Sequence, residues 1–316
     1  SLRYSGYLDT VVTLTGLEND IIYFRKDVQE VQEVTVKPGE NPAHRIIKEA
    51  QNNRKKNHPL KNDAFTYKSY SKFVFDVNEK VMKPDDAKDT MTIKLKEYFT
   101  NQHLFVMESA SRRTFDPPNR DQEEILAYKL SGTTDPSLSI FAQSMQSFNF
   151  YDNQFIILGE TFMNPIASDG ISRYLFILED TLIKQSDTTY TIYFRPRKGK
   201  NFKGLQGRLY INTNGFAVEK VNASASRPGG TGSFDVTILQ EYAFIENTKW
   251  FPVKLSTELA FGEFPSEKDT IRGMILGGGH TYIDSIVLNP DIKRRGFYDN
   301  YDLYTSPDAA DMKEAD

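Results

Sequence analysis

Few side chains in this 316-residue sequence have the types and spacing that chemistry requires. The four histidines, His44, His58, His103 and His280, are far apart, and none stands in an HxxH, HxxE or HExxH arrangement. Zinc sites that are readable from a sequence show such short spacings. The sequence therefore predicts no metal site, and we expect no cofactor.

Motifs for catalysis do not occur either. GxSxG, GxGxxG and P-loop patterns are missing, and the absence of Cys excludes thiol catalysis and disulfides. Asp299 with Asp302, or Asp116 with Asp121, could be read as paired carboxylates, but acidic residues in loops are usually only solvated. We therefore expect a protein that is not an enzyme and has no catalytic residue.

Three consecutive glycines, Gly277-Gly278-Gly279, suggest a phosphate-binding loop at first sight. No Lys-Ser/Thr pair follows them, and the next residues have the pattern of a strand rather than a helix. We interpret the glycines as a bulge or bend where a sheet curves.

One dense basic cluster lies between two predicted strands. With two flanking aromatic residues it supplies the candidate ligand-binding residues: Phe194, Arg195, Arg197, Lys198, Lys200, Lys203 and Phe216. Such a cluster could contact anionic lipid headgroups or lipopolysaccharide. The alternative is a solvated hairpin connection that keeps a sheet edge from aggregating.

The elements that must position this cluster are strands. Across residues 190–221 apolar residues alternate with polar ones, and Thr213-Asn214-Gly215 interrupts the pattern, which is a strong hairpin signal. Similar alternation recurs between residues 64 and 288, and we count about ten strands there. We expect residues 190–221 to form the middle of an antiparallel sheet.

The predicted fold class is α+β and predominantly antiparallel β: a strongly curved sheet, or half-barrel, with a few covering helices. Those helices are expected near residues 42–53, 122–130 and 136–146. Asn41-Pro42 is a good helix start, and Ile46, Ile47 and Ala50 give it an apolar stripe. Because few helices cover many apolar strand faces, we expect the concave face to be half open and able to hold an acyl chain.

Bulk composition narrows the function class. The formal net charge of -4 argues against a nucleic-acid partner. No apolar run approaches the roughly 18 residues that a membrane helix needs, and no signal peptide is present. Because the chain opens inside a strand-like pattern, we expect an excised piece or a processed fragment of a longer protein.

Several stretches resemble a known family. VQEVTVKPG (residues 31–39), followed by NPAHRII (residues 41–47), resembles the junction after a carboxypeptidase-regulatory-like β-sandwich in large Gram-negative outer-membrane proteins. Residues 42–300 are similar to the uncharacterised domain family that follows that sandwich. The matching segments are residues 65–75 (YxSYxKF), 144–153 (QSFNFYDN), 174–182 (LEDTL) and 199–215.

The resemblance implies a domain organisation. Residues 1–38 would be the C-terminal remnant of the sandwich, residues 39–297 the curved-sheet domain, and residues 298–316 an acidic tail or linker toward an outer-membrane β-barrel. Residues 205–221 also resemble, more weakly, the half-barrels of periplasmic lipoprotein carriers, which hold acyl chains. The resemblance thus implies a place at the periplasmic face of the outer membrane.

The leading functional hypothesis is a non-enzymatic periplasmic region of an outer-membrane protein. It would bind an apolar or lipidated ligand, such as a lipid or lipoprotein, or a partner protein in envelope assembly or transport. The alternative is a structural docking module between sandwich and barrel, with a filled interior and no ligand. A hydrolase acting on envelope glycans or peptides is less favoured, and the residues to test for it are His103, Asp116 and His280.

Overall fold

The computed structural model describes residues 41–77, 93–94, 97, 102–132, 149–157, 159–184, 187–226, 234–261, 264–265, 270–271, 275–292 and 300–311. The predicted sandwich remnant at residues 1–38 and the predicted helix at residues 136–146 lie outside this part of the chain. In the described part, no helix is long and apolar enough to cross a membrane.

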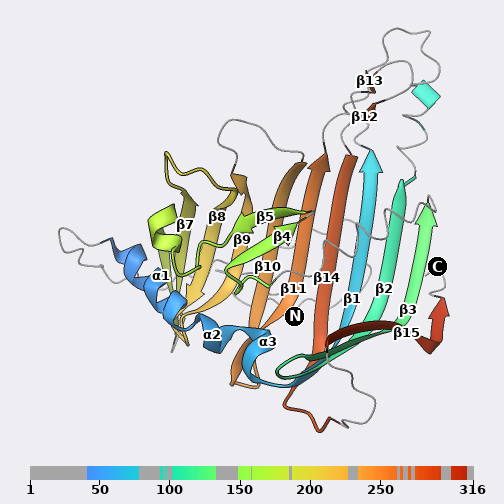
Figure 1. Ribbon diagram of the computed structural model, residues 1–316, viewed down its shortest axis with the longest axis horizontal. Helices are drawn as coiled ribbons and strands as arrows, with labels where there is room; N and C mark the ends of the chain where they lie inside the picture. The colour runs from blue at the N-terminus through green and yellow to red at the C-terminus, as the bar shows by residue number, and fades with distance from the viewer. Residues whose placement is uncertain are drawn as a thin grey trace, which may run out of the picture.

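One large sheet of 13 strands dominates the fold (Figure 1). Its main path runs in the order β15-β3-β2-β1-β14-β11-β10-β9-β8-β5-β4, and β7 joins β8 to β6. All neighbours pair antiparallel except β15 with β3 and β5 with β8. The strands are β1 (Phe65–Val77), β2 (Phe105–Asp116), β3 (Arg120–Gly132), β4 (Gln154–Ile157), β5 (Glu160–Met163), β6 (Tyr174–Lys184), β7 (Asp187–Pro196), β8 (Gly204–Asn212), β9 (Ala217–Ser226), β10 (Phe234–Ile245), β11 (Lys249–Phe261), β14 (Ile275–Leu288) and β15 (Asn300–Asp311). A separate two-stranded sheet joins β12 (Phe264–Pro265) to β13 (Thr270–Ile271).

The predicted fold class, α+β with a strongly curved sheet or half-barrel, is wrong, because strands dominate the described residues and helices are few. The sheet is mostly antiparallel as expected, but it is open and does not curl strongly (Figure 1). The physical reason lies in how the apolar strand faces are buried. The chain lays its own hairpin β4–β5 and helix α1 (Pro42–Asn52) against strands β6 to β10, so the sheet does not have to close on itself to exclude water.

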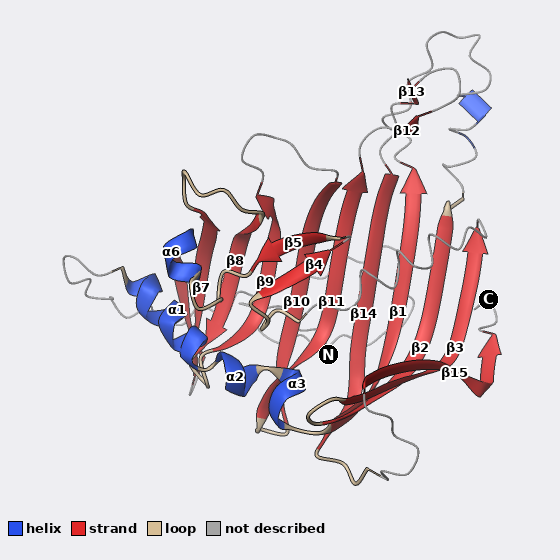
Figure 2. Ribbon diagram, viewed as in Figure 1, coloured by secondary structure: helices blue, strands red, loops and turns tan. Residues whose placement is uncertain are grey.

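The predicted helix near residues 42–53 is confirmed as α1: the Asn41 side chain accepts a hydrogen bond from the Ala43 N–H at 3.0 Å, and Ile46, Ile47 and Ala50 are buried. Further helices are α2 (Arg54–Asn57), α3 (Pro59–Asn62) and α6 (Gly170–Arg173). The labelled helices run from α1 and α6 beside β7 to α2 and α3 below β10 and β11 (Figure 2).

The helix predicted near residues 122–130 is wrong, because these residues belong to strand β3. Acidic side chains at the start of this segment form ion pairs with the neighbouring strand instead of capping a helix N-terminus. Glu124 forms an ion pair with Arg112 at 3.2 Å, and Asp121 forms one with Arg113 at 2.6 Å. Both arginines are on β2. Opposite charges on neighbouring strands stabilise the pairing of those strands.

Residues 190–221 form the three predicted strands. They are β7, β8 and β9, and the turn between β8 and β9 contains Gly215 and Phe216, both with positive φ. Their predicted place in the middle of the sheet is wrong. They lie toward one end of the strand order, and β11, β14 and β1 occupy the middle.

Gly277-Gly278-Gly279 form a regular part of β14, so the predicted bulge is wrong. They pair in unbroken register with Phe75, Val74 and Phe73 of β1. A Cβ at Gly277 would come within 2.8 Å of the Phe75 ring. The glycine therefore makes room for an aromatic side chain on the neighbouring strand.

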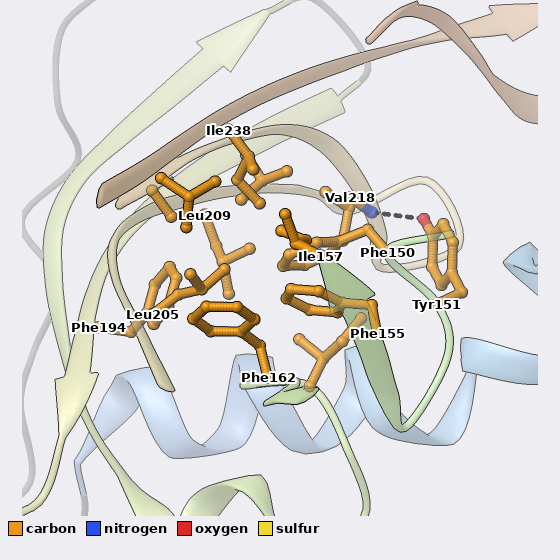
Figure 3. Packing of buried hydrophobic residues seen from close by; sticks show 14 of the residues in the cluster. Phe150, Tyr151, Phe155, Ile157, Phe162, Phe194, Leu205, Leu209, Val218 and Ile238 are labelled. Atoms are coloured by element: carbon orange, nitrogen blue, oxygen red, sulfur yellow. Dashed lines mark hydrogen bonds between the residues drawn. The ribbon is translucent and has the colours of Figure 1, made fainter. Parts of the chain in front are cut away.

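The largest hydrophobic core lies between strands β7–β10 and hairpin β4–β5 (Figure 3). Phe150, Phe155 and Phe162 point toward Leu205, Leu209, Val218 and Ile238 of the sheet. The Tyr151 hydroxyl accepts a hydrogen bond from the Val218 N–H at 2.9 Å. This half of the sheet has its apolar face filled by protein side chains.

At the other end of the sheet, β15 pairs parallel to β3. Its residues, Asn300–Asp311, belong to the acidic segment that the sequence assigns to a tail or linker. They add an edge strand beyond β3.

Candidate functional site

The predicted basic residues lie in and around the β7–β8 connection. Lys198 and Lys200 are exposed, and Lys203, also exposed, forms an ion pair with Glu160 of β5 at 2.8 Å. Arg195 donates to the Pro196 carbonyl at 3.3 Å, and Arg197 donates from its Nε to the Ile171 carbonyl at 3.3 Å. Several of these side chains therefore tie local structure together.

The two aromatic residues predicted to share this site lie elsewhere. Phe194 is fully buried in the core, with its ring 5.8 Å from that of Tyr174. Phe216 is at the β8–β9 turn, the far end of β8 from Lys203, and nine strand residues span about 30 Å. The structure therefore does not assemble the predicted basic and aromatic residues into one pocket.

The candidate residues for a hydrolase are not brought together either. His103 pairs with Asp76 at 2.8 Å beside the start of β2, whereas Asp116 pairs with Arg120 at 2.6 Å at its other end. His280 is on β14 and bonds to Ser256 at 3.0 Å, on the opposite face of the sheet from Phe75. These three residues do not share a cleft.

An apolar pocket lies instead over the middle of the sheet. It has a volume of about 80 Å³ and is covered by α3 and by residue 149. Its lining residues come from α3, β1, β2, β10, β11 and β14: Pro59, Leu60, Phe65, Tyr67, Arg113, Asn149, Gln240, Tyr242, Phe251, Pro252, Leu255 and Ile283. We call this space the central pocket.

Aromatic rings form one wall of the central pocket. The Phe65 ring stacks on Tyr67 with centroids 5.7 Å apart, and Phe251 meets Phe65 edge to face at 4.9 Å. Phe65 also stacks on Phe115 at 5.3 Å. Because alternate residues of a strand share one face, β1 contributes both Phe65 and Tyr67 to this wall. Such aromatic pairs fix the shape of the pocket.

A partly buried ion pair lies at one side of the pocket. Arg113 holds Asp121 through two hydrogen bonds of 2.8 and 2.6 Å, and its third contact reaches the Tyr67 hydroxyl at 3.4 Å. Burial alone would lower the pKa of Arg113, but Tyr67 and Asp121 raise it well above its usual value. Burial also raises the pKa of the Tyr67 hydroxyl. The pocket therefore combines an apolar wall with a fixed guanidinium cation and a neutral phenol.

The opposite side of the pocket carries neutral polar groups. The Tyr242 hydroxyl donates to the Gln240 amide oxygen at 2.8 Å, and both side chains are buried. Burial raises the pKa of Tyr242 well above its usual value, so the hydroxyl stays protonated. Convergent polar groups around an apolar space are typical of a binding site for small molecules.

His58 holds the cover of the pocket in place. Its Nδ1 accepts from the Leu60 N–H at 3.1 Å and from the Asn149 amide at 3.2 Å, so its Nε2–H donates to Asp152 at 3.1 Å. The imidazole is buried. One side chain thus caps α3 and links it to residues 149–152.

The sequence contained only part of the signal for this pocket. The shared parity of Phe65 and Tyr67 is visible in it, but Arg113, Gln240 and Ile283 lie on strands far apart in the chain. Only the strand order β2-β1-β14-β11-β10 brings them side by side.

Comparisons with known proteins identify a family but no activity. The model of the family of unknown function DUF5686 matches residues 46–270. No curated protein matches the sequence. A LolA superfamily protein, NE2245 from Nitrosomonas europaea, is 11% identical, with 81% of this chain and 97% of that chain covered and a TM-score of 0.28.

Two further solved structures are similar at the same level. A DUF1329 family protein from Desulfovibrio piger is 8% identical, with 81% and 96% of the two chains covered and a TM-score of 0.30. Lipovitellin is 11% identical, with 76% and 27% covered and a TM-score of 0.28. TM-scores this low establish neither a shared fold nor a shared ligand.

Proposed function

We propose that this chain, which belongs to the DUF5686 family of unknown function, is a non-enzymatic domain that binds the hydrocarbon part of a lipid or lipidated protein in the central pocket. The observation that carries the proposal is an apolar space walled by the aromatic rings of Phe65, Tyr67 and Phe251. A hydrocarbon chain offers the matching chemistry, since the aromatic and aliphatic side chains of the lining exclude water and the Arg113 guanidinium beside them is already paired with Asp121.

Size decides how such a ligand is held. The pocket of about 80 Å³ is smaller than the roughly 150 Å³ engineered cavity that takes up one benzene molecule. In the observed arrangement it accepts only the end of a hydrocarbon chain. A complete acyl chain enters when α3 and residues 149–152 move away from the sheet.

Replacing His58 with alanine should loosen this cover. The substitution removes the α3 cap and both links to residues 149 and 152, so we expect the free energy of unfolding to fall by about 1 kcal/mol. We also expect a fluorescent fatty acid to associate faster. Stopped-flow fluorescence measures the rate. An unchanged or slower association would show that α3 is not the cover.

Filling the pocket should abolish binding. We expect Leu255→Trp to weaken binding of a fluorescent fatty acid at least about tenfold, or 1.4 kcal/mol, because the indole occupies the space that the chain needs. Leu276→Trp on the opposite face of neighbouring strand β14, where the side chain is exposed, is the matched control and should bind normally.

The proposal also predicts bound lipid in the protein as purified. Mass spectrometry of a solvent extract should show an amphiphile in the wild-type protein and a reduced amount in Leu255→Trp. Absence of lipid from the wild-type extract, together with no binding of the fluorescent fatty acid, would exclude the proposed function.

A second function is favoured by one observation, the filled interior of strands β7–β10. There Phe150, Phe155 and Phe162 occupy the apolar face that an acyl chain would need. A structural docking module between a sandwich and a membrane barrel requires such a core and no ligand. This alternative would be supported if the domain bound the sandwich and the barrel tightly in a pull-down experiment and the solvent extract contained no lipid.

The cellular setting is part of the proposal. We place the domain at the periplasmic face of the outer membrane, within a longer chain that carries an outer-membrane barrel, and we infer a role in envelope assembly or transport. The sequence segments that resemble envelope proteins support this placement. Fractionation of cells that express the tagged full-length protein tests it, and recovery in the cytoplasmic fraction would contradict it.

A further inference from the structure

A second hollow lies on the other face of the sheet from the central pocket. Its volume is about 390 Å³, and its described lining comes from β9, β10, β11 and β14: Asn222, Thr237, Leu239, Lys254, Ser256, Glu258, His280 and Tyr282. On β10, Ile238 and Gln240 are buried on the central-pocket side, so the alternating residues Thr237 and Leu239 point the other way. We call this space the outer hollow.

Strand pairing explains how the outer hollow is formed. Ser256 pairs with His280, and Lys254 pairs with Tyr282 one row away. On the other side, Glu258 pairs with Gly278, which has no side chain to fill the space beside the carboxylate. A Cβ added at Gly278 would meet no atom closer than the His280 Nε2, at 3.8 Å. The missing side chain therefore opens the sheet surface at this row.

The lining has the chemistry of a site for a polar ligand with an apolar face. Leu239 is the one aliphatic residue among the described lining residues, so a hydrocarbon chain would leave many polar groups desolvated. The Tyr282 side chain is 48% exposed, and Lys254 lies over its ring at 5.6 Å from the centroid. The ring offers a flat surface for stacking once the Lys254 side chain moves off the face that it covers, while its hydroxyl remains available to water.

Hydrogen-bonding groups of both kinds line the outer hollow. Lys254 carries donors, Glu258 carries acceptors, and Asn222 carries both. The His280 ring nitrogen Nδ1 and the Ser256 hydroxyl lie 3.0 Å apart at the floor. The lysine and the glutamate balance in charge, which does not favour a phosphate or another strongly charged ion.

We propose that the outer hollow binds a saccharide. A sugar ring has an apolar face of C–H groups that stacks on tyrosine, and a rim of hydroxyls that donate and accept hydrogen bonds. The volume of about 390 Å³ falls within the roughly 300–1,000 Å³ of known small-molecule sites. This site is independent of the central pocket, because the two spaces open on opposite faces of the sheet.

Ligand-observed saturation-transfer NMR tests the proposal with chitotriose and maltotriose as probes. We expect the ring protons of at least one probe to receive saturation from the wild-type protein. Tyr282→Ala should reduce the signal at least fivefold because the stacking surface is lost. Gly278→Leu should do the same because its side chain fills the hollow. Tyr128→Ala, which removes a similarly exposed tyrosine on β3, is the control and should leave the signal unchanged.

Fatty-acid binding separates this result from the function proposed above. Gly278→Leu should bind a fluorescent fatty acid as the wild-type protein does and should unfold at the same temperature, because the added side chain enters open space. No transfer to either probe from the wild-type protein would overturn the saccharide site. Saturation transfer at the wild-type level from both Tyr282→Ala and Gly278→Leu would overturn it as well.

Discussion

Arg113→Met is expected to lower the free energy of unfolding by about 1–3 kcal/mol, the usual cost of leaving a largely buried polar group without its hydrogen-bond partner. The substitution leaves Asp121, whose side chain is 13% exposed, without the two hydrogen bonds that it accepts from the guanidinium. Methionine fills a similar volume, so the loss of charge dominates. Urea unfolding measures the change.

A second variant separates the ion pair from the packing. In Arg113→Met/Asp121→Asn the uncompensated carboxylate is removed, so we expect at least half of the lost stability to return. If the double variant is no more stable than Arg113→Met, packing around the side chain determines the effect. A loss below about 1 kcal/mol in Arg113→Met would place this pair with ordinary surface ion pairs.

Phe162→Ala is expected to lower the free energy of unfolding by about 3–5 kcal/mol, as for other buried phenylalanines. The Phe162 ring stacks on Phe155 at 6.0 Å and is 3% exposed beneath the sheet strands (Figure 3). Its removal opens a space between hairpin β4–β5 and the sheet. Thermal and urea unfolding both report the loss.

The matched control for Phe162→Ala is Ile156→Ala on the same hairpin. Ile156 is 60% exposed, so truncation removes little buried area and should change the stability by less than about 0.5 kcal/mol. Equal effects of the two substitutions would show that β4–β5 does not seal this half of the sheet. The account of the filled interior would then be wrong.

Local signals in the sequence predicted individual elements well. Asn41-Pro42 marks the start of α1, and Thr213-Asn214-Gly215 marks the turn between β8 and β9. Both signals depend on residues close in the chain: an amide that caps a helix, and a glycine that adopts a positive φ. Such preferences act before any tertiary contact forms.

Elements that depend on distant partners were predicted poorly. The segment DQEEILAYK (residues 121–129) has acidic residues and an apolar stripe that fit a helix, but Arg112 and Arg113 on β2 offer opposite charges across a strand pair. Contacts with the neighbouring strand β2 therefore determined that residues 121–129 form a strand rather than a helix. The same holds for the curvature of the sheet, which depends on where hairpin β4–β5 packs.

The candidate site was the least predictable part. Among the predicted ligand-binding residues, the basic ones are the most visible in the sequence because they are contiguous. The described lining of the central pocket has no contiguous motif, and Arg113, the one basic residue in it, belongs to a strand whose neighbours are set by the order of the whole sheet. Composition and spacing cannot show that arrangement.

Photocrosslinking with a fatty acid that carries a diazirine near its chain end tests the central proposal most directly. We expect peptide mass spectrometry to find the label on residues that line the central pocket, such as Leu60, Phe251, Leu255 or Ile283. Labelling should disappear when Leu255→Trp is used or when unlabelled fatty acid is added in excess. A label spread over exposed residues, or confined to the β7–β8 connection, would contradict the proposal that the central pocket holds the hydrocarbon chain.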